Sequence, residues 1–491
     1  MGRRTSLAAI GIVAATIGLA GANADLRLID AVKNHDAEAI RTLVGRVDVN
    51  TRQPDGATAL HWAAHNDDRA AADLLIRAGA NVNAANELGA TPLWLAAAQG
   101  SATMVARLLD AGANPNVALE EGETPLMAAA RTGTLDAVKL LASRGADVNA
   151  REHLRNQTSL MWAAANDRAD VVRTLIELHA DLDARSATRS LVVNTGIQAG
   201  SGGYNPPGQA DHEEGGFTPL LFAARRGSVA SATLLIDAGA SVDRPAANGA
   251  SPLVIAVHSG NGELARLLLD KGADPNTAGA GYTALHAAVL RGDADTVKAL
   301  LAHKANPDAV LEKGTPIRRT SIDWALNYTW IGSTPYWLAA RFADATAMRL
   351  LAEAGADTRF AMKDGTTALM AAVGMGFGGG DRRYRGIGAV IGGVDDERAA
   401  LDAAKVAVQF GADVNAANPA TGDTALHTAA AKRMNSVVQF LVESGATLDA
   451  RNKKDQTPLA VVGTQRGGSN AAAGAAKEST ADLLRRLGAH Q

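Results

Sequence analysis

A small set of histidines and carboxylates includes most of the side chains in this chain that could ligate a metal or take part in catalysis. His61, His286 and His427 each stand three residues after a Thr, and Asp211-His212-Glu213-Glu214 forms one contiguous acidic cluster. Such a cluster could ligate a cation, but its residues are contiguous and no second His lies near it in sequence. We therefore interpret 211–214 as part of a solvated loop. The chain has no Cys, which excludes disulfides, thiolate metal sites and Cys nucleophiles.

A glycine-rich stretch near 375–395 is the other segment that could bind a ligand, because Arg382, Arg383, Tyr384 and Arg385 lie in its middle. Backbone N–H groups and arginines could cradle a phosphate or carboxylate. The stretch lacks the Gly-Lys-Ser/Thr ending of a phosphate loop and follows no predicted strand, so we interpret it as a mobile surface loop. No hydrolase, zinc-protease, calcium-loop or dinucleotide motif appears either. The sequence thus predicts no enzyme activity, no cofactor and no metal.

The elements that position these residues follow a regular repeat. A Thr(or Ser)-X-Leu unit, with Tyr336 in place of Leu in one copy, occurs eleven times, at intervals of 33, 33, 34, 60, 33, 32, 51, 33, 57 and 33 residues. A fixed period of this size is typical of a solenoid of stacked supersecondary units. The marker residues are Thr58, Thr91, Thr124, Thr158, Thr218, Ser251, Thr283, Thr334, Thr367, Thr424 and Thr457.

The unit is clearest over 86–116. Thr91 can cap a first helix that Pro92 opens and Gly100 ends. A second helix is predicted over 102–110, with Val105, Leu108 and Leu109 facing inward, and Gly112 supplies a left-handed C-terminal cap. His179 and Lys304 replace this Gly in two repeats, from which we expect locally remodelled turns.

These motifs resemble the ankyrin repeat. Its pattern of Gly-x-Thr-Pro-Leu-His, Ala-Ala, Gly, Leu-Leu and Gly-Ala-Asp-x-Asn is matched in 55–83, 121–149, 248–276 and 421–449, among others. The resemblance implies an all-α repeat solenoid of stacked helix pairs, with β-hairpin-like turns at one edge and partners bound at the hairpin tips and the concave face. It also implies that His61, His286 and His427 have structural hydrogen-bonding roles. We expect capping repeats at 25–53 and 454–491, which flank repeats over 54–453.

Three insertions interrupt the period. The first (186–215) and the second (310–332) precede a marker Thr and should emerge at the hairpin edge, whereas the third (375–395) follows a first helix and should emerge opposite. The first insertion contains Tyr204 beside a Pro-Pro pair, which favours an extended segment.

The second insertion is rich in aromatic residues. It contains Trp324, Tyr328 and Trp330, and together with Tyr336 and Trp337, which follow it, these are five of the eleven Trp and Tyr residues of the chain. Trp and Tyr dominate protein interfaces, so Trp324, Tyr328 and Trp330 are candidates for partner binding. The alternative is that these rings pack back on the solenoid. We expect Trp337 to lie in the core.

The predicted function is recognition of another protein. The candidate contacts at the hairpin tips are Asp55, Glu87, Leu88, Glu120, Glu121 and Arg155, together with Tyr204, Trp324, Tyr328, Trp330, Arg383 and Tyr384 in the insertions. The net charge of -3 argues against nucleic acid as a partner. Two alternatives stay open. One is a ligand-binding protein or hydrolase whose pocket is built by the insertions, and the other is an effector secreted into a host cell.

The N-terminus predicts export. Arg3 and Arg4 precede an apolar run over 7–20, and Ala22-Asn23-Ala24 matches a cleavage site, so 1–24 is predicted to be a signal peptide that is removed before Asp25. The run is too short to span a bilayer comfortably, and no later run reaches the length of a membrane span. The expected location is periplasmic or secreted.

Overall fold

The computed structural model describes residues 25–194, 209–315, 326, 328–374, 394–464 and 478–490. The chain divides into two compact units, 1–147 and 148–491, and each unit is described by itself. The predicted signal peptide, 1–24, lies outside the described residues.

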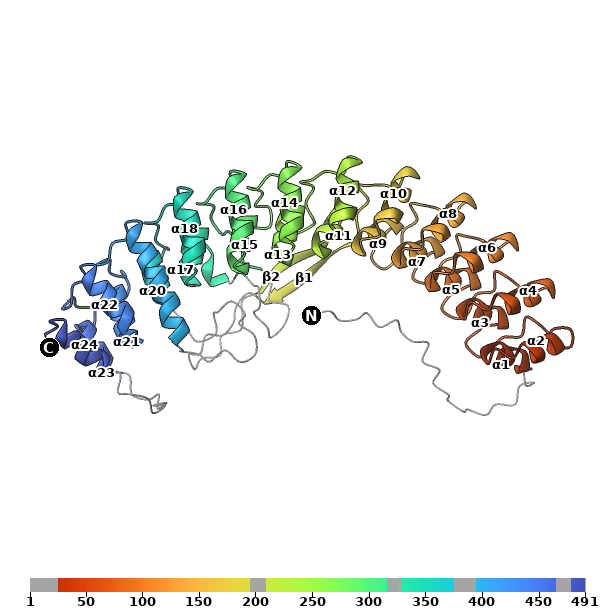
Figure 1. Ribbon diagram of the computed structural model, residues 1–491, viewed down its shortest axis with the longest axis horizontal. Helices are drawn as coiled ribbons and strands as arrows, with labels where there is room; N and C mark the ends of the chain where they lie inside the picture. Colours follow the sequence, from red (N-terminus) through yellow and green to blue (C-terminus); the bar gives the residue numbers. More distant parts are fainter. Residues whose placement is uncertain are drawn as a thin grey trace. The chain divides into compact units, whose positions relative to one another are not determined.

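The first unit is a stack of helix pairs. The first helices of successive pairs pack on one another and so do the second helices (Figure 1). The pairs are α1 (Arg27–Lys33) with α2 (Ala37–Leu43), α3 (Ala59–His65) with α4 (Arg69–Arg77), α5 (Pro92–Gln99) with α6 (Ala102–Asp110), and α7 (Pro125–Thr132) with α8 (Leu135–Ser143).

The second unit repeats this arrangement and adds one β-hairpin, β1 (Thr188–Asn194) and β2 (Gln209–Gly215). Its first helices are α9 (Ser159–Ala165), α11 (Pro219–Arg226), α13 (Pro252–Ser259), α15 (Ala284–Arg291), α17 (Pro335–Arg341), α19 (Ala368–Ala372), α21 (Ala425–Ala431) and α23 (Pro458–Thr464). Its second helices are α10 (Ala169–Glu177), α12 (Val229–Asp237), α14 (Gly262–Asp270), α16 (Ala294–Ala302), α18 (Ala345–Glu353), α20 (Val394–Gln409), α22 (Asn435–Glu443) and α24 (Thr480–Arg486). A short 3-10 turn covers Tyr328–Trp330. The predicted repeat solenoid is therefore confirmed.

The marker residues begin the first helices because their side chains cap them. In ten of the eleven repeats the side-chain oxygen of the marker residue accepts a hydrogen bond from the backbone N–H three residues later, as Thr91 does from Trp94. This bond satisfies one of the N–H groups that the start of a helix leaves without a partner. The Leu two residues after the marker is buried in every repeat except that of Thr334, where Tyr336 takes its place and is also buried.

Except for α2, the second helices end on a left-handed residue, as the repeat pattern predicts. Gly112 has a φ of +88°, and at the same position His179 and Lys304 have φ of +62° and +66°. The hydrogen bonds of these turns are nevertheless the same: Gly112 N–H donates to Leu109 and His179 N–H donates to Ile176. The expectation of remodelled turns was wrong, because the flanking bonds hold the turn shape and the substituted residue bears the strain of about 1 kcal/mol.

An asparagine ladder joins neighbouring repeats beyond the second helices. The Oδ1 of Asn83 accepts the N–H of Asn114 at 2.8 Å, and its Nδ2 donates to the carbonyl of Gly112 at 3.2 Å. Asn276 makes the same pair of bonds to Asn306 and Lys304 in the second unit. Each such Asn therefore fixes the cap of the next repeat to its own.

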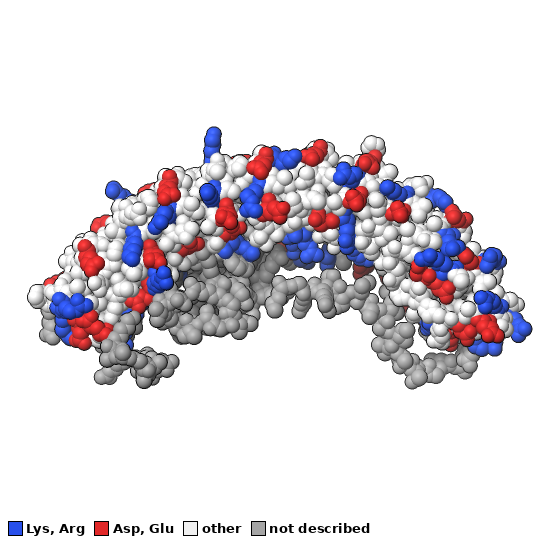
Figure 2. Space-filling model, viewed as in Figure 1, with Lys and Arg blue, Asp and Glu red and all other residues white. Residues whose placement is uncertain are grey.

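The second helices also exchange ion pairs with their neighbours, such as Arg107 with Asp73 at 2.8 Å and Lys271 with Asp237 at 2.6 Å. Figure 2 accordingly shows Lys and Arg interleaved with Asp and Glu over the visible face of the molecule. Because these side chains are about half exposed, each pair contributes little to stability.

The first insertion folds in part as an antiparallel hairpin. Seven residues of β1 pair with seven of β2, from Thr188 opposite Gly215 to Asn194 opposite Gln209. The expectation that 211–214 is a solvated loop was therefore wrong. Its acidic residues lie on a strand, since residues of β1 supply backbone partners that the local sequence does not reveal.

The third insertion lies between α19 and α20, as the interval predicts, although 375–393 lies outside the described residues. Among the described helices none combines the length and the apolar character that a membrane span requires.

Candidate functional site: the tips of the repeats

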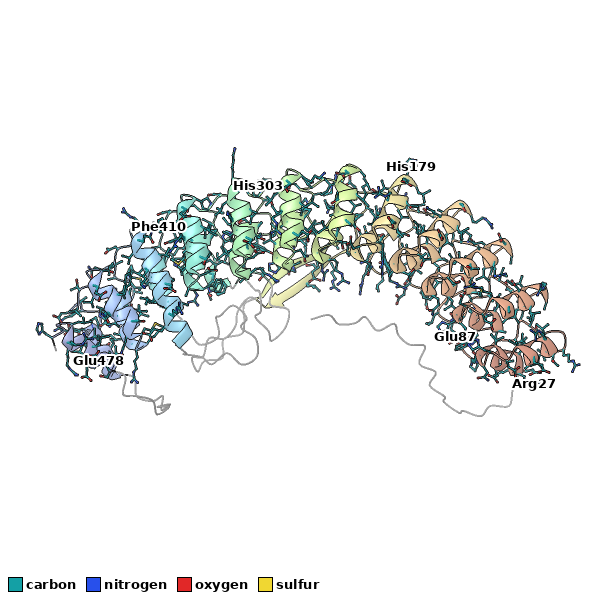
Figure 3. The ribbon with its side chains drawn as sticks, in the orientation of Figure 1. Arg27, Glu87, His179, His303, Phe410 and Glu478 are labelled. Atoms are coloured by element: carbon teal, nitrogen blue, oxygen red, sulfur yellow. The ribbon has the colours of Figure 1, made fainter. Side chains whose placement is uncertain are left out.

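The turn that precedes each marker residue, which we call the tip, is held by its own side chains. In 86–90 the Oδ1 of Asn86 accepts the N–H groups of Leu88 and Ala90, at 3.1 and 2.8 Å. The carbonyl of Ala90 in turn accepts the N–H of Asn86 at 3.0 Å. These bonds hold the shape of the turn, and the side chains of Glu87 and Leu88 are exposed on it. Figure 3 shows Glu87 at this edge of the first unit.

Neighbouring tips are joined by a backbone ladder. In the first unit Glu87 N–H donates to Asp55 O at 2.9 Å and Glu120 N–H donates to Leu88 O at 3.1 Å. In the second unit Lys453 N–H donates to Thr421 O at 2.9 Å. Side chains on consecutive tips are thus held in a fixed order along one edge of each unit.

Glu152 holds the first tip of the second unit, and sequence reasoning missed it. Its carboxylate is buried and accepts N–H groups from Leu154 at 2.7 Å, Arg155 at 2.9 Å and Gln157 at 3.1 Å. The interval of 34 from Thr124 to Thr158 is the signal that could have found it. The extra residue lengthens this tip, and Glu, which is longer than Asn, reaches its N–H groups.

The exposed apolar side chains gather at the tips. Among the described residues six large apolar side chains are more than a third exposed: Leu88, Leu154, Leu178, Val192, Val310 and Ile331. Leu178 caps the C-terminus of α10, whereas the other five lie on tips or on the insertions that extend them. Burial of such side chains is the usual source of affinity at a protein interface.

Both hairpin-edge insertions are lengthened tips. Ser186 N–H donates to Phe217 O at 3.0 Å and Leu311 N–H donates to Ser333 O at 2.9 Å, which are the bonds that close ordinary tips. The tip ladder also continues through their bases, since Ala187 N–H donates to Arg155 O at 2.7 Å. The insertions therefore extend the edge without interrupting it.

The candidate contacts divide into three groups. Glu87, Leu88, Glu121 and Arg155 are all exposed on tips, and their part in binding stays a prediction. Tyr204, Trp324, Arg383 and Tyr384 lie outside the described residues, and so does the side chain of Tyr328. Trp330 forms the third group, because it is described and buried.

Trp330 is only 6% exposed. Its ring meets Phe342 edge to face at 5.5 Å between centroids, and the guanidinium of Arg341 lies 5.9 Å from it. The proposal of Trp330 as a partner contact was wrong, because this ring packs back on the solenoid, which was the stated alternative. Trp337 lies in the core as expected, where its Nε1 donates to Thr366 O at 2.9 Å.

The histidines after the marker residues are structural. His61 Nδ1 accepts the Thr58 N–H at 3.1 Å, and its Nε2 lies 2.9 Å from the carbonyl of Ala90 in the next tip. His427 makes the corresponding contact to Gln456 O at 3.0 Å. Burial lowers the pKa of His61, and it lowers the pKa of fully buried His286 to about 4. A neutral ring suits this role at His61 and His286, since burial disfavours the charged form.

No group of three or more His, Asp and Glu side chains among the described residues could hold a metal ion. A hollow of about 320 Å³ lies between α18 and α20, where Arg349, Glu353, Asp402 and Lys405 line it with charges of both signs. The described residues that line it all belong to α18 and α20, so it gives no support to a pocket built by the insertions.

The family models agree with the fold. The family model for ankyrin repeats in three copies matches residues 28–118, 103–186, 203–279 and 221–310, and the single ankyrin-repeat model matches 421–453. Among 558 matching chains of solved structures, the crystal structure of the human ASB11 ankyrin repeat domain is 28% identical. That match covers 50% of this chain and 98% of that one, with a TM-score of 0.41. The comparison with curated proteins found no match.

Proposed function

The chain belongs to the ankyrin-repeat family, and on that premise we propose that it is an exported scaffold that binds another protein along the tips of its repeats. Ankyrin repeats commonly mediate interactions between proteins. The observation that carries the proposal is the gathering of exposed apolar side chains at the tips, five of the six among the described residues.

The structure of the tips supports this role physically. In the turn 86–90 the backbone N–H groups are bonded within the turn or to the neighbouring tip, so a partner need not supply acceptors to them. Leu88 and Leu154 therefore lie on turns that are already ordered, so less conformational entropy is lost when a partner binds them. Acidic and basic groups beside them, such as Glu87 and Arg155, would select among partners.

The test is site-specific crosslinking with Leu178 as the matched control. A photoreactive residue at Leu154 should yield a discrete adduct with one protein in the native cells, and the same residue at Leu178 should not. Leu178 suits the comparison because it is also an exposed Leu of the second unit but caps a second helix. Equal adducts at both positions, or none at either, would refute binding at the tips.

Export is the second part of the proposal, and it rests on the charged and apolar pattern of 1–24. Removal of this segment before Asp25 leaves α1, which begins at Arg27, intact. Fractionation should place the protein in the periplasm or the medium, with Asp25 as its first residue by mass spectrometry. A protein that keeps Met1 and stays in the cytoplasm would refute export.

A further inference from the structure

The β1–β2 hairpin differs from the other tips that the structure describes because it extends into a two-stranded ribbon. Its base is anchored: Ala187 N–H donates to Arg155 O at 2.7 Å, and Ala247 N–H donates to Gly215 O at 3.1 Å. Among the described residues neither strand pairs with a third strand (Figure 1). Each strand therefore presents a row of backbone N–H and C=O groups that another strand could pair with.

The two faces of the ribbon differ in character. On one face Arg189 forms an ion pair with Glu214 at 2.8 Å, and half-buried Leu191 lies opposite His212. These two cross-strand contacts favour the observed pairing of β1 with β2. On the other face Ser190 and Val192 of β1 lie opposite Glu213 and Asp211 of β2, and all four are exposed.

The exposed face carries an unbalanced negative charge. Asp211 and Glu213 make no ion pair with any described residue. Val192, beside them, is 65% exposed and is the most exposed large apolar side chain among the described residues. A strand added next to β2 would thus lie beside the carboxylates of Asp211 and Glu213. Val192 on β1 would lie beyond them on the same face.

Charge decides which strand can occupy this edge. A second copy of β2 would bring carboxylates against carboxylates, which destabilises cross-strand pairs. A strand with Lys or Arg at alternate positions would instead face Asp211 and Glu213 and would gain cross-strand pairing. A two-stranded ribbon is marginally stable by itself, so a third strand would also stabilise the hairpin.

We propose that the outer edge of β2 binds an extended basic segment of the partner protein by β-strand addition. This inference rests on the proposed function and specifies the chemistry of the partner. Backbone hydrogen bonds supply the pairing, and alternate Lys or Arg side chains opposite Asp211 and Glu213 supply the selection.

The test uses the full mature chain and a seven-residue probe peptide with Lys at alternate positions and Val or Thr between them. Binding is measured by fluorescence anisotropy. A second peptide carries Glu in place of Lys, and a third keeps Lys but has N-methyl groups on alternate amides. We expect the Lys peptide to bind at least tenfold more tightly than either, because the Glu peptide repels the edge and the N-methylated peptide cannot pair along it.

Charge variants locate the site. The double variant Asp211→Asn/Glu213→Gln should weaken binding of the Lys peptide at least fivefold. Glu263→Gln/Asp295→Asn makes the same charge change on exposed first turns of α14 and α16, and it should change binding less than twofold. Hydrogen exchange of 211–214 should slow on binding. The inference is overturned if the N-methylated peptide binds equally well, if both double variants weaken binding equally, or if no peptide binds.

The last outcome would leave an acidic edge that only prevents self-pairing. Such a failure is distinguishable from failure of the proposed function, because crosslinking at Leu154 reports partner binding independently of β2.

Discussion

Asn83 gives the sharpest test of how neighbouring repeats are joined. Its side chain makes two bonds to the next repeat, one accepted from Asn114 N–H at 2.8 Å and one donated to Gly112 O at 3.2 Å. A typical net hydrogen bond contributes about 1 kcal/mol. Asn83→Ala removes both, and water can reach the groups that are left, so we expect a local loss of about 1–2 kcal/mol. In a solenoid that loss falls on one interface between repeats.

Asn83→Asp separates the two bonds. The carboxylate keeps the acceptor for Asn114 N–H but loses the donor to Gly112 O. The chain itself contains this variant: Asp243 and Asp308 accept the N–H groups of Asp274 and Asp357, at 3.0 and 2.7 Å. We therefore expect Asn83→Asp to cost about half as much as Asn83→Ala.

Native-state hydrogen exchange at the amide of Asn114 measures the effect directly. A loss of about 1–2 kcal/mol speeds exchange roughly 5- to 30-fold, since local opening follows the free energy. The reciprocal change, Asp243→Asn, should slow exchange at Asp274. Equal exchange in Asn83→Asp and Asn83→Ala, or no change in either, would refute the assignment of two separable bonds.

Three further predictions concern stability. Because the folded pKa of His286 is about 4, below its unfolded value, its contribution is present above about pH 6.5 and is lost as the pH falls toward 4. The full loss is about 3 kcal/mol, of which about 2 kcal/mol falls between pH 7 and 5. Hydrogen exchange of α15 should show this difference between the two pH values, and His286→Met should abolish it. Gly249→Ala would place a Cβ 2.3 Å from Gly279 O, whereas Gly272→Ala, also at positive φ, meets no atom within 4 Å. Urea titration should show a loss of about 1 kcal/mol for Gly272→Ala and clearly more for Gly249→Ala; equal losses would contradict the close approach. Arg107→Gln should cost less than about 1 kcal/mol, since the pair with Asp73 is half exposed, and a larger loss would mean that the ion pair is structural.

The repeat could be predicted from the sequence because its determinants are local. Thr91 caps a helix through a residue three positions away, and Gly112 ends one through its own φ. Such information is contained in a short stretch of sequence. The period then supplies the stacking, since each helix pair needs a neighbour to bury its apolar face.

The parts that could not be predicted depend on distant partners. Leu191 lies opposite His212, although the two residues are far apart in the sequence of the first insertion. The residues near 211–214 give no sign that a second strand pairs with them. Whether Trp330 is buried or exposed depends on Phe342 at the end of α17, since the two rings pack against each other. Aromatic composition favours both a core and an interface, so only the position of that partner decides between them.

The pairing of β1 with β2 imposes a rule of parity on changes in the length of this hairpin. Val192 lies opposite Asp211 on the exposed face and Leu191 lies opposite His212 on the other. Deletion of one residue from each strand would turn every residue beyond the deletion to the opposite face, whereas deletion of two from each would preserve both faces. Related hairpins that keep an acidic face should therefore differ in length by even numbers of residues per strand, which makes this insertion a spacer adjustable only in steps of about 7 Å.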